Sequence, residues 1–402
     1  MKRASLRTVL CALMCAVCLA GCADKPEGTV EEGFVRSQVD AYVKLFKASA
    51  RKNREGNLLI SPLSVQVALA LAANGAAGET RAEMEKVLGG MAVSELNQQL
   101  SAYISGLPSE EKCRLKTANS IWIKDNEDLL KVNPEFLRVN EEYYGAQAYR
   151  VPFDSRTAEE INGWVKDNTE GMIDRIIERI DPDTMMYLIN AVSFEADWSS
   201  QYLKENVGEG SFTAASGEKR TVEMMSSLES KYIRSRNASG FIKDYAGGKY
   251  GFAVLLPNQG VDIYDYVAGL DADSLIDTLQ NAQERSVRAF MPKFSCEFNM
   301  DMKEMLIKLG MPTAFSSGAD FSGMTQNASS GLSISKVLHK TYISVTEQGT
   351  RAGAVTAVEM TYGSASESAP PVIRLDRPFV YMIIDNAACL PVFMGILADT
   401  EG

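Results

Sequence analysis

Apolar residues recur at helical spacing early in the chain and at strand spacing later. Five of them between positions 35 and 46 fall on one helical face, which predicts an amphipathic helix; they are Val35, Val39, Tyr42, Val43 and Phe46. Strand-like runs follow at 118–123, 186–194, 252–256, 287–291, 334–337, 342–346 and 380–384, with helical stretches at 158–168 and 300–309. Helices dominate the first part and strands the second, so we predict one large α+β domain.

A second helix is predicted directly after Ser61. Serine is a favoured N-cap, and Pro62 fits the first helical position. The following residues 65–73 are rich in alanine and leucine and present no polar face, so we expect this helix to be deeply buried. Thr80 and Glu83 have the spacing of a capping box, which predicts the start of the next helix at Thr80.

Residues 347–371 stand between two predicted strands and consist mainly of small residues. Structureless loops longer than about 15 residues are uncommon inside a compact domain and are usually functional or disordered. Alternate residues from Thr350 to Tyr362 are uncharged, whereas Arg351 and Glu359 fall on the other face. This period of two is typical of a strand with one buried face. We therefore interpret the segment as an exposed loop that is patterned for insertion into a sheet.

The first residues form a targeting segment. Three basic residues precede the apolar stretch 9–20, which is too short to span a bilayer comfortably. The stretch ends in Leu-Ala-Gly-Cys22, which looks like a lipobox, where cleavage precedes a cysteine that carries the lipid. We expect residues 1–21 to be a lipoprotein signal peptide and 22–33 a flexible tether anchored at Cys22. A plain signal peptide with a chance cysteine is the alternative.

Charge and composition exclude several classes of function. The formal net charge of −11 leaves no basic surplus to neutralise phosphates, so we expect no nucleic-acid partner. His339 is the only histidine, which excludes metal sites that need two, and no GxSxG or HExxH segment occurs. We expect no catalytic residue, no metal site and no cofactor. Beyond the signal and Cys22, we expect three buried thiols without a disulfide framework: Cys113, Cys296 and Cys389.

Several motifs resemble those of the serpin family, in the family's order and spacing. They span residues 35–399 and include 57–64 (NLLISPLS), 75–80 (GAAGET), 190–198 (NAVSFEADW), 291–294 (MPKF), 347–356 (EQGTRAGAVT) and 376–381 (DRPFVY). The resemblance implies that residues 34–402 form a single serpin domain. That fold has a large central mixed β-sheet, surrounding helices, further sheets and an exposed reactive loop at about 347–371.

The resemblance also implies suicide-substrate inhibition of serine endopeptidases, with cysteine endopeptidases left open as a second target class. The protease attacks a bond in the reactive loop and forms an acyl-enzyme, after which the loop inserts into the central sheet and traps the protease. The chain is then not an enzyme, and its partner is the target protease. A non-inhibitory serpin that binds a partner or acts as a protease substrate is the alternative. The small, uncharged inward residues of the hinge favour inhibition; the hinge comprises Glu347, Gly349, Thr350, Ala352, Ala354 and Thr356.

Two polar clusters are implied by the same resemblance. The first lies beneath the sheet, controls its opening and must be hydrogen-bonded to be tolerated there; its members are Ser61, Ser64, Asn190 and His339. The second lies at the base of the loop and comprises Trp198, Lys293 and Glu347. Lys293 and Glu347 are expected to form a salt bridge, with a solvated pair of little energetic effect as the alternative.

Two neighbouring bonds are candidates for the scissile bond. The family's usual distance from the hinge glycine leads to Gly363–Ser364, and Tyr362–Gly363 is one step away. The small residues suit elastase-like or subtilisin-like proteases, whereas Tyr362 suits a chymotrypsin-like one. A trypsin-like target is not expected, because no Lys or Arg lies between Arg351 and Arg374.

The targeting segment and the serpin resemblance together predict an exported inhibitor at a bacterial cell envelope. It would be a monomer held to the membrane by the lipid on Cys22, in the periplasm or at the cell surface.

Overall fold

The structure is a computed structural model that describes residues 31–126, 128, 130–181, 184–327, 332–350 and 369–401. Its helices are α1 (Glu32–Lys52), α2 (Pro62–Ala73), α3 (Gly78–Val87), α4 (Val93–Ser105), α5 (Pro134–Tyr144), α6 (Ser155–Asn168), α7 (Ile263–Ala268), α8 (Ala272–Gln280) and α9 (Lys303–Leu309). Its strands are β1 (Leu58–Ile60), β2 (Ser109–Glu110), β3 (Cys113–Lys124), β4 (Gln147–Val151), β5 (Met186–Asp197), β6 (Val207–Thr213), β7 (Lys219–Arg234), β8 (Ala238–Asp244), β9 (Tyr250–Pro257), β10 (Gln283–Pro292), β11 (Phe294–Asp301), β12 (Leu338–Val345), β13 (Gly349–Thr350), β14 (Val372–Arg374), β15 (Phe379–Asp385) and β16 (Leu390–Leu397).

A seven-stranded sheet, termed the central sheet below, runs through the middle of the molecule. Its strand order is β11-β12-β13-β5-β3-β2, and β4 pairs with β3 in parallel while the other pairs are antiparallel. The long strands β5 and β12 are neighbours only through the short strand β13. Within the described residues, no other strand joins them.

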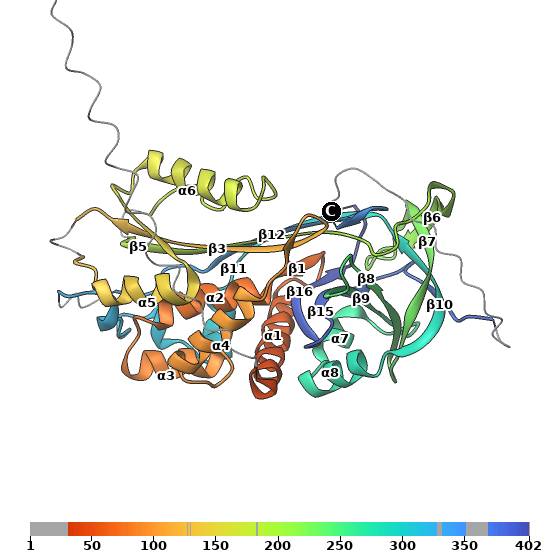
Figure 1. The fold of residues 1–402 in the computed structure, drawn as a ribbon, viewed down its shortest axis with the longest axis horizontal. Coiled ribbons are helices and arrows are strands. Elements are labelled where there is room, and N and C mark those ends of the chain that lie inside the picture. The colour runs from red at the N-terminus through yellow and green to blue at the C-terminus, as the bar shows by residue number, and fades with distance from the viewer. Residues whose placement is uncertain are drawn as a thin grey trace, which may run out of the picture.

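Helices cover both faces of the central sheet. Figure 1 shows α6 alone on one face and α2 to α5 on the other. Helix α2 is buried along almost its whole length, as its lack of a polar face predicts, and it packs against β5 and β16. The apolar side of α6 packs on β3 and β5 in a separate small hydrophobic cluster that includes Trp122, Ile161 and Ile189.

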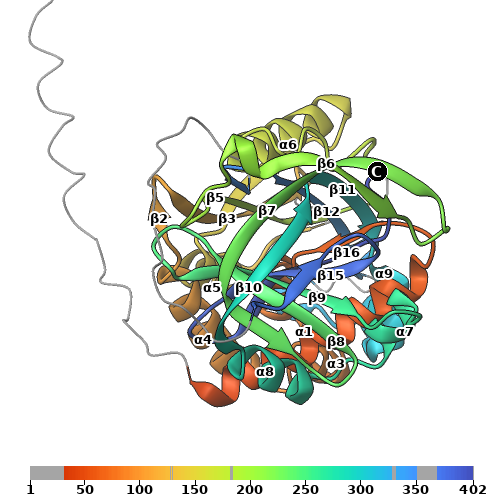
Figure 2. The ribbon, with the colours of Figure 1, turned by 90° about the vertical axis from the view of Figure 1, so that its right-hand side faces the viewer.

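The second sheet has nine strands and forms the other end of the molecule. Its order is β1-β16-β15-β9-β8-β7-β10-β14, with β6 on β7, and Figure 2 looks onto it. Every residue of β9, β15 and β16 is buried. Continuous apolar strands of this kind need cover on both faces.

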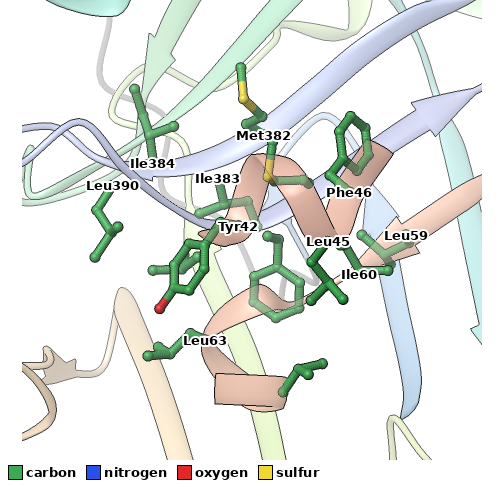
Figure 3. Close-up of a cluster of buried hydrophobic side chains, with 14 of the residues drawn as sticks. Tyr42, Leu45, Phe46, Leu59, Ile60, Leu63, Met382, Ile383, Ile384 and Leu390 are labelled. Atoms are coloured by element: carbon green, nitrogen blue, oxygen red, sulfur yellow. The ribbon is translucent and has the colours of Figure 1, made fainter. Parts of the chain in front are cut away.

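The main core lies where the second sheet meets α1 and α2. Each large apolar side chain that is fully buried there contributes about 1.5–3 kcal/mol to stability. Figure 3 shows one part of it, with side chains from α1, β1, α2, β15 and β16 turned towards one another. The residues labelled there are Tyr42, Leu45, Phe46, Leu59, Ile60, Leu63, Met382, Ile383, Ile384 and Leu390.

The local predictions near the N-terminus have mixed outcomes. Ser61 caps α2 as predicted, because its Oγ accepts a hydrogen bond from the Ser64 amide at 3.3 Å. The capping box at Thr80 and Glu83 is wrong, since α3 begins at Gly78. Both side chains instead bind distant backbone amides, those of Asp320 and Thr313, which the local spacing cannot reveal.

Three predicted element boundaries also differ. Residues 334–337 are not a strand, because the Ile334 amide bonds to Ala314 O rather than to a neighbouring strand, and β12 begins at Leu338. The helix predicted from 300 begins at Lys303, because Met300 and Asp301 are the last residues of β11. Helix α1 begins at Glu32 and so includes the last two residues of the predicted tether.

Candidate functional site

The segment that leads into the predicted reactive loop is already paired inside the central sheet. In β13, Thr350 is paired with Val345 of β12 and with Ala196 of β5, antiparallel to both. Gly349 lies so close to β5 that a Cβ there would stand 2.1 Å from Ala196 O, so only glycine fits. Thr350 is 1% exposed. A chain that continues from β13 in the same direction runs between β12 and β5.

Aromatic residues hold this segment from the side of β5. The indole Nε1 of Trp198 donates to Thr346 O at 2.9 Å, and the Trp198 amide donates to Gln348 O at 2.8 Å. The Tyr202 amide donates to Glu347 O at 3.0 Å. Residues 346–350 together with Trp198, Tyr202 and Tyr245 are termed the hinge seat below.

Tyr245 is a member of the hinge seat that the sequence reasoning missed. Its ring stacks on Trp198 with centroids 4.5 Å apart, and its hydroxyl lies 2.5 Å from Thr350 Oγ1. Complete burial raises the pKa of the Tyr245 hydroxyl well above its ordinary value, so the phenol stays neutral. No local signal in the sequence marks this tyrosine, because its role depends on a partner more than 100 residues away.

The predicted ion pair at the base of the loop is present. Lys293 Nζ lies 2.6 Å from Glu347 Oε1 and 3.2 Å from Glu223 Oε2. Burial is the largest influence on Glu347 and alone would raise its pKa, but the hydrogen bond from Lys293, a backbone hydrogen bond and the charges of Lys293 and Lys204 together lower it. Burial likewise opposes the charge of Lys293, while both carboxylates raise its pKa above the usual value. Both side chains are about one quarter exposed, which screens their interaction.

Three of the four residues in the predicted cluster beneath the sheet are brought together. The Ser61 amide donates to His339 Nε2 at 3.0 Å, the Ser64 amide donates to Ser61 Oγ, and Ser61 Oγ donates to Val392 O. Complete burial lowers the pKa of His339 to about 4, so its ring is neutral at pH 7 and Nε2 accepts the hydrogen bond. This network ties β12 to the start of α2.

Asn190, the fourth residue, does not join this network and is hydrogen-bonded to the neighbouring strand β3 instead. Its Nδ2 donates to Asn119 Oδ1 on β3 at 2.8 Å, while its own Oδ1 has no hydrogen-bond partner among the described residues. A cavity of about 160 Å³ lies between β5 and β12, and Ser64, Asn190 and His339 all line it. The rest of its lining is mainly apolar and comes from α2, from the segment after α6 and from both strands; it includes Val65, Leu69, Ile176, Ile177, Leu188 and Leu338.

Sequence comparison assigns the family. The family model described as Serpin (serine protease inhibitor) matches residues 37–400. The chain belongs to the serpin family. Members of this family are mostly protease inhibitors rather than catalytic enzymes, which confirms the expectation that the chain is not an enzyme.

Individual relatives agree with this assignment. The chain is 33% identical to the leukocyte elastase inhibitor of Bos taurus, over 89% of this chain and 97% of that protein. It is 32% identical to an uncharacterised serpin-like protein of Thermococcus kodakarensis, over 89% and 83% of the two chains. The crystal structure of the thermophilic serpin tengpin in its native state superposes with a TM-score of 0.87 at 43% identity, covering 92% of this serpin and 95% of tengpin.

Several predicted site residues lie outside the described residues. They are the lipidation site Cys22, the hinge residues Ala352, Ala354 and Thr356, and the scissile-bond candidates Tyr362, Gly363 and Ser364. In the part of the chain that the structure does describe, no group of three His, Cys, Asp or Glu side chains could hold a metal ion. None of the described helices has both the length and the apolar character needed to cross a membrane.

Proposed function

We propose that this serpin is a suicide-substrate inhibitor of serine endopeptidases, with cysteine endopeptidases as a further target class. The observation that carries the proposal is the position of β13. Its two residues lie between β12 and β5 and run in the direction that would extend a new strand into the sheet. Insertion of a reactive loop is the established serpin case of strand addition.

The chemical step belongs to the protease. Its nucleophile attacks the carbonyl carbon of Gly363, the bond to the Ser364 nitrogen breaks, and the Ser364 amine leaves with a proton. Gly363 then remains as an acyl-enzyme on the protease. Tyr362–Gly363 is the second candidate bond, cleaved by the same chemistry. The proposed targets are therefore elastase-like, subtilisin-like or chymotrypsin-like.

Insertion competes with hydrolysis of the acyl-enzyme. Successive inserted residues gain backbone hydrogen bonds alternately to β5 and to β12, which have no other common neighbour strand than β13 in the described residues. Thr350 is buried at the entry, and a strand of period two places Ala352, Ala354 and Thr356 on its face. These side chains are small and uncharged, so the inward face can enter the sheet without burying a charge.

The cavity lies between the two strands at their end away from the hinge. Opening the sheet there leaves the Ser61–His339 network on the β12 side and the Asn190–Asn119 bond on the β5 side. We assign the sheet-opening role to this arrangement, since neither network would have to break when a strand passes between them.

The test is a denaturing gel combined with mass spectrometry. The body from Ala23 is mixed with an elastase-like, a chymotrypsin-like and a subtilisin-like protease. A covalent complex that survives denaturant, together with a C-terminal peptide whose mass places the cut at 363–364 or 362–363, is the expected result. Cleavage in the loop without any complex would instead support a non-inhibitory serpin.

The anchor is part of the proposal. We propose that Cys22 carries a lipid that holds an exported, monomeric inhibitor at a bacterial cell envelope, on the periplasmic or the outer surface. The basic and apolar segment before Cys22 supports this. Detergent phase partitioning of the full chain and of Cys22→Ser tests it. The wild type should enter the detergent phase and the variant should not; equal partitioning would contradict the anchor.

A further inference from the structure

A buried ion pair lies directly behind the hinge seat. Lys243 of β8 and Glu229 of β7 are 2% and 8% exposed, and Lys243 Nζ donates to Glu229 Oε1 at 2.8 Å. The same carboxylate oxygen accepts a hydrogen bond from Ser227 Oγ at 2.6 Å. Buried charges are costly unless paired, and the motifs that identify the serpin fold do not include either residue.

The ammonium group of this pair faces two rings of the hinge seat. Lys243 Nζ lies 4.4 Å from the centre of the Tyr202 ring and 5.5 Å from that of Trp198. A desolvated cation at such distances is attracted to the ring faces. Because Glu229 fixes the ammonium group, the cation holds both rings in place.

Trp198 and Tyr202 bind three consecutive backbone carbonyls at the start of the reactive loop. Trp198 binds the carbonyls of Thr346 and Gln348, and the Tyr202 amide binds that of Glu347. Trp198 also stacks on Tyr245, which meets Thr350. A continuous set of contacts therefore runs from Glu229 through Lys243 and the rings to β13.

We propose that Lys243 and Glu229 are positioning residues for loop insertion. By holding Trp198 and Tyr202, the pair keeps the first two inserted residues docked between β12 and β5, so that insertion continues from an existing start. Its effect on inhibition rests on the proposed function, whereas its effect on the hinge seat does not. Neither residue touches the protease.

The test variant removes the charge of both partners at once. Changing Lys243 alone would leave Glu229 buried and unpaired, which destabilises a fold for reasons unrelated to the hinge. The double variant Lys243→Met with Glu229→Leu replaces the pair by apolar side chains of similar size, an exchange that is often neutral for stability. The matched control is Arg220→Met with Asp399→Leu, which removes a half-buried pair that has no contact with the hinge seat.

The first measurement is hydrogen exchange in the uncleaved protein. The amides of Trp198 and Tyr202, which donate to the loop carbonyls, should exchange about tenfold faster in the double variant and at the wild-type rate in the control. Lys243→Arg keeps the cation and should stay close to wild type. Unchanged exchange in a folded double variant overturns the proposal. Glu229→Gln keeps the shape but leaves Lys243 without its counter-charge, so its loss of stability is measured first by urea unfolding; the two amides should exchange about threefold faster than that loss alone accounts for.

The second measurement is the number of inhibitor molecules consumed per protease trapped. It should rise several-fold in the double variant, because hydrolysis overtakes an insertion that has lost its docked start, while the control and Lys243→Arg should match wild type. A folded double variant with the wild-type number overturns the proposed role in insertion. Wild type that traps no protease at all refutes the proposed function, and the exchange rates still decide whether the pair holds the hinge.

Discussion

At one end of the strand pair β5 and β12, the hinge seat closes the central sheet with stacked rings and hydrogen bonds. At the other end, a cavity of about 160 Å³ separates the same strands, and an amide oxygen of Asn190 lacks a partner among the described residues. The closed end fixes where a new strand starts, and the open end leaves room for it to continue. A single pair of strands thus combines a rigid entry with a weakly packed path.

The largest expected effect comes from breaking the closed end with Thr350→Arg. The arginine would put a charge between β12 and β5, where the native side chain is 1% exposed, so the loop can no longer begin to insert. Covalent complex on a denaturing gel should fall at least tenfold while cleavage of the loop continues. Arg351→Glu, on the alternate face, is the control and should leave complex formation intact. A Thr350→Arg protein that still forms complex would show that insertion does not use β13.

The histidine beside the open end gives the next largest effect, through pH. His339 has a pKa of about 4 when folded against 6.5 ordinarily, so the unfolded chain binds a proton first as the pH falls. The free energy of unfolding should be constant above pH 7 and should fall between pH 6.5 and pH 4 by about 3 kcal/mol from this group. Urea unfolding of the wild type and of His339→Gln measures the difference. The same pH dependence in both proteins would contradict the assignment.

Filling the open end should have a smaller effect of opposite sign. Ala68 lines the cavity, whereas Ala70, two positions later on α2, is fully buried away from its lining. Ala68→Val should raise the free energy of unfolding by about 1 kcal/mol and slow insertion. Ala70→Val adds the same β-branched group to packed surroundings and should lower it by about 1–3 kcal/mol. Equal shifts from the two substitutions would show that the cavity does not weaken this end.

The smallest effect concerns the ion pair at the edge of the closed end. Lys293→Met should lower the free energy of unfolding by only about 0.5–1 kcal/mol, because Lys293 and Glu347 are both partly exposed and water screens their attraction. High salt should reduce the difference from wild type in urea unfolding. Lys340→Met, which removes a pair with Glu297 away from the hinge, is the control for inhibition rate. An equal loss of inhibition in both variants would show that the Lys293–Glu347 pair has no specific role at the hinge.

The sequence predicted features that depend on local order and on motifs. Ser61 as a cap, the burial of α2 and the Lys293–Glu347 pair are of this kind. Features that depend on distant partners could not be read from it. Tyr245 meets Thr350 only because two sheets converge, and Thr80 and Glu83 bind amides of a segment far along the chain.

Asn190 shows the same limit within a recognised motif. Its motif placed it beneath the sheet, but the spacing of residues could not tell that its amide would bind Asn119 rather than the Ser61–His339 network. The choice is set by the register of β3 and β5, which places Asn119 directly opposite Asn190.

The central position of β15 and β16 has a consequence for biosynthesis. These strands lie between β1 and β9, and they complete the core against α1, which is made first. A nascent chain that lacks residues 379–397 therefore leaves uncovered the part of α1 that packs on β16. Such a chain cannot reach its fold during synthesis.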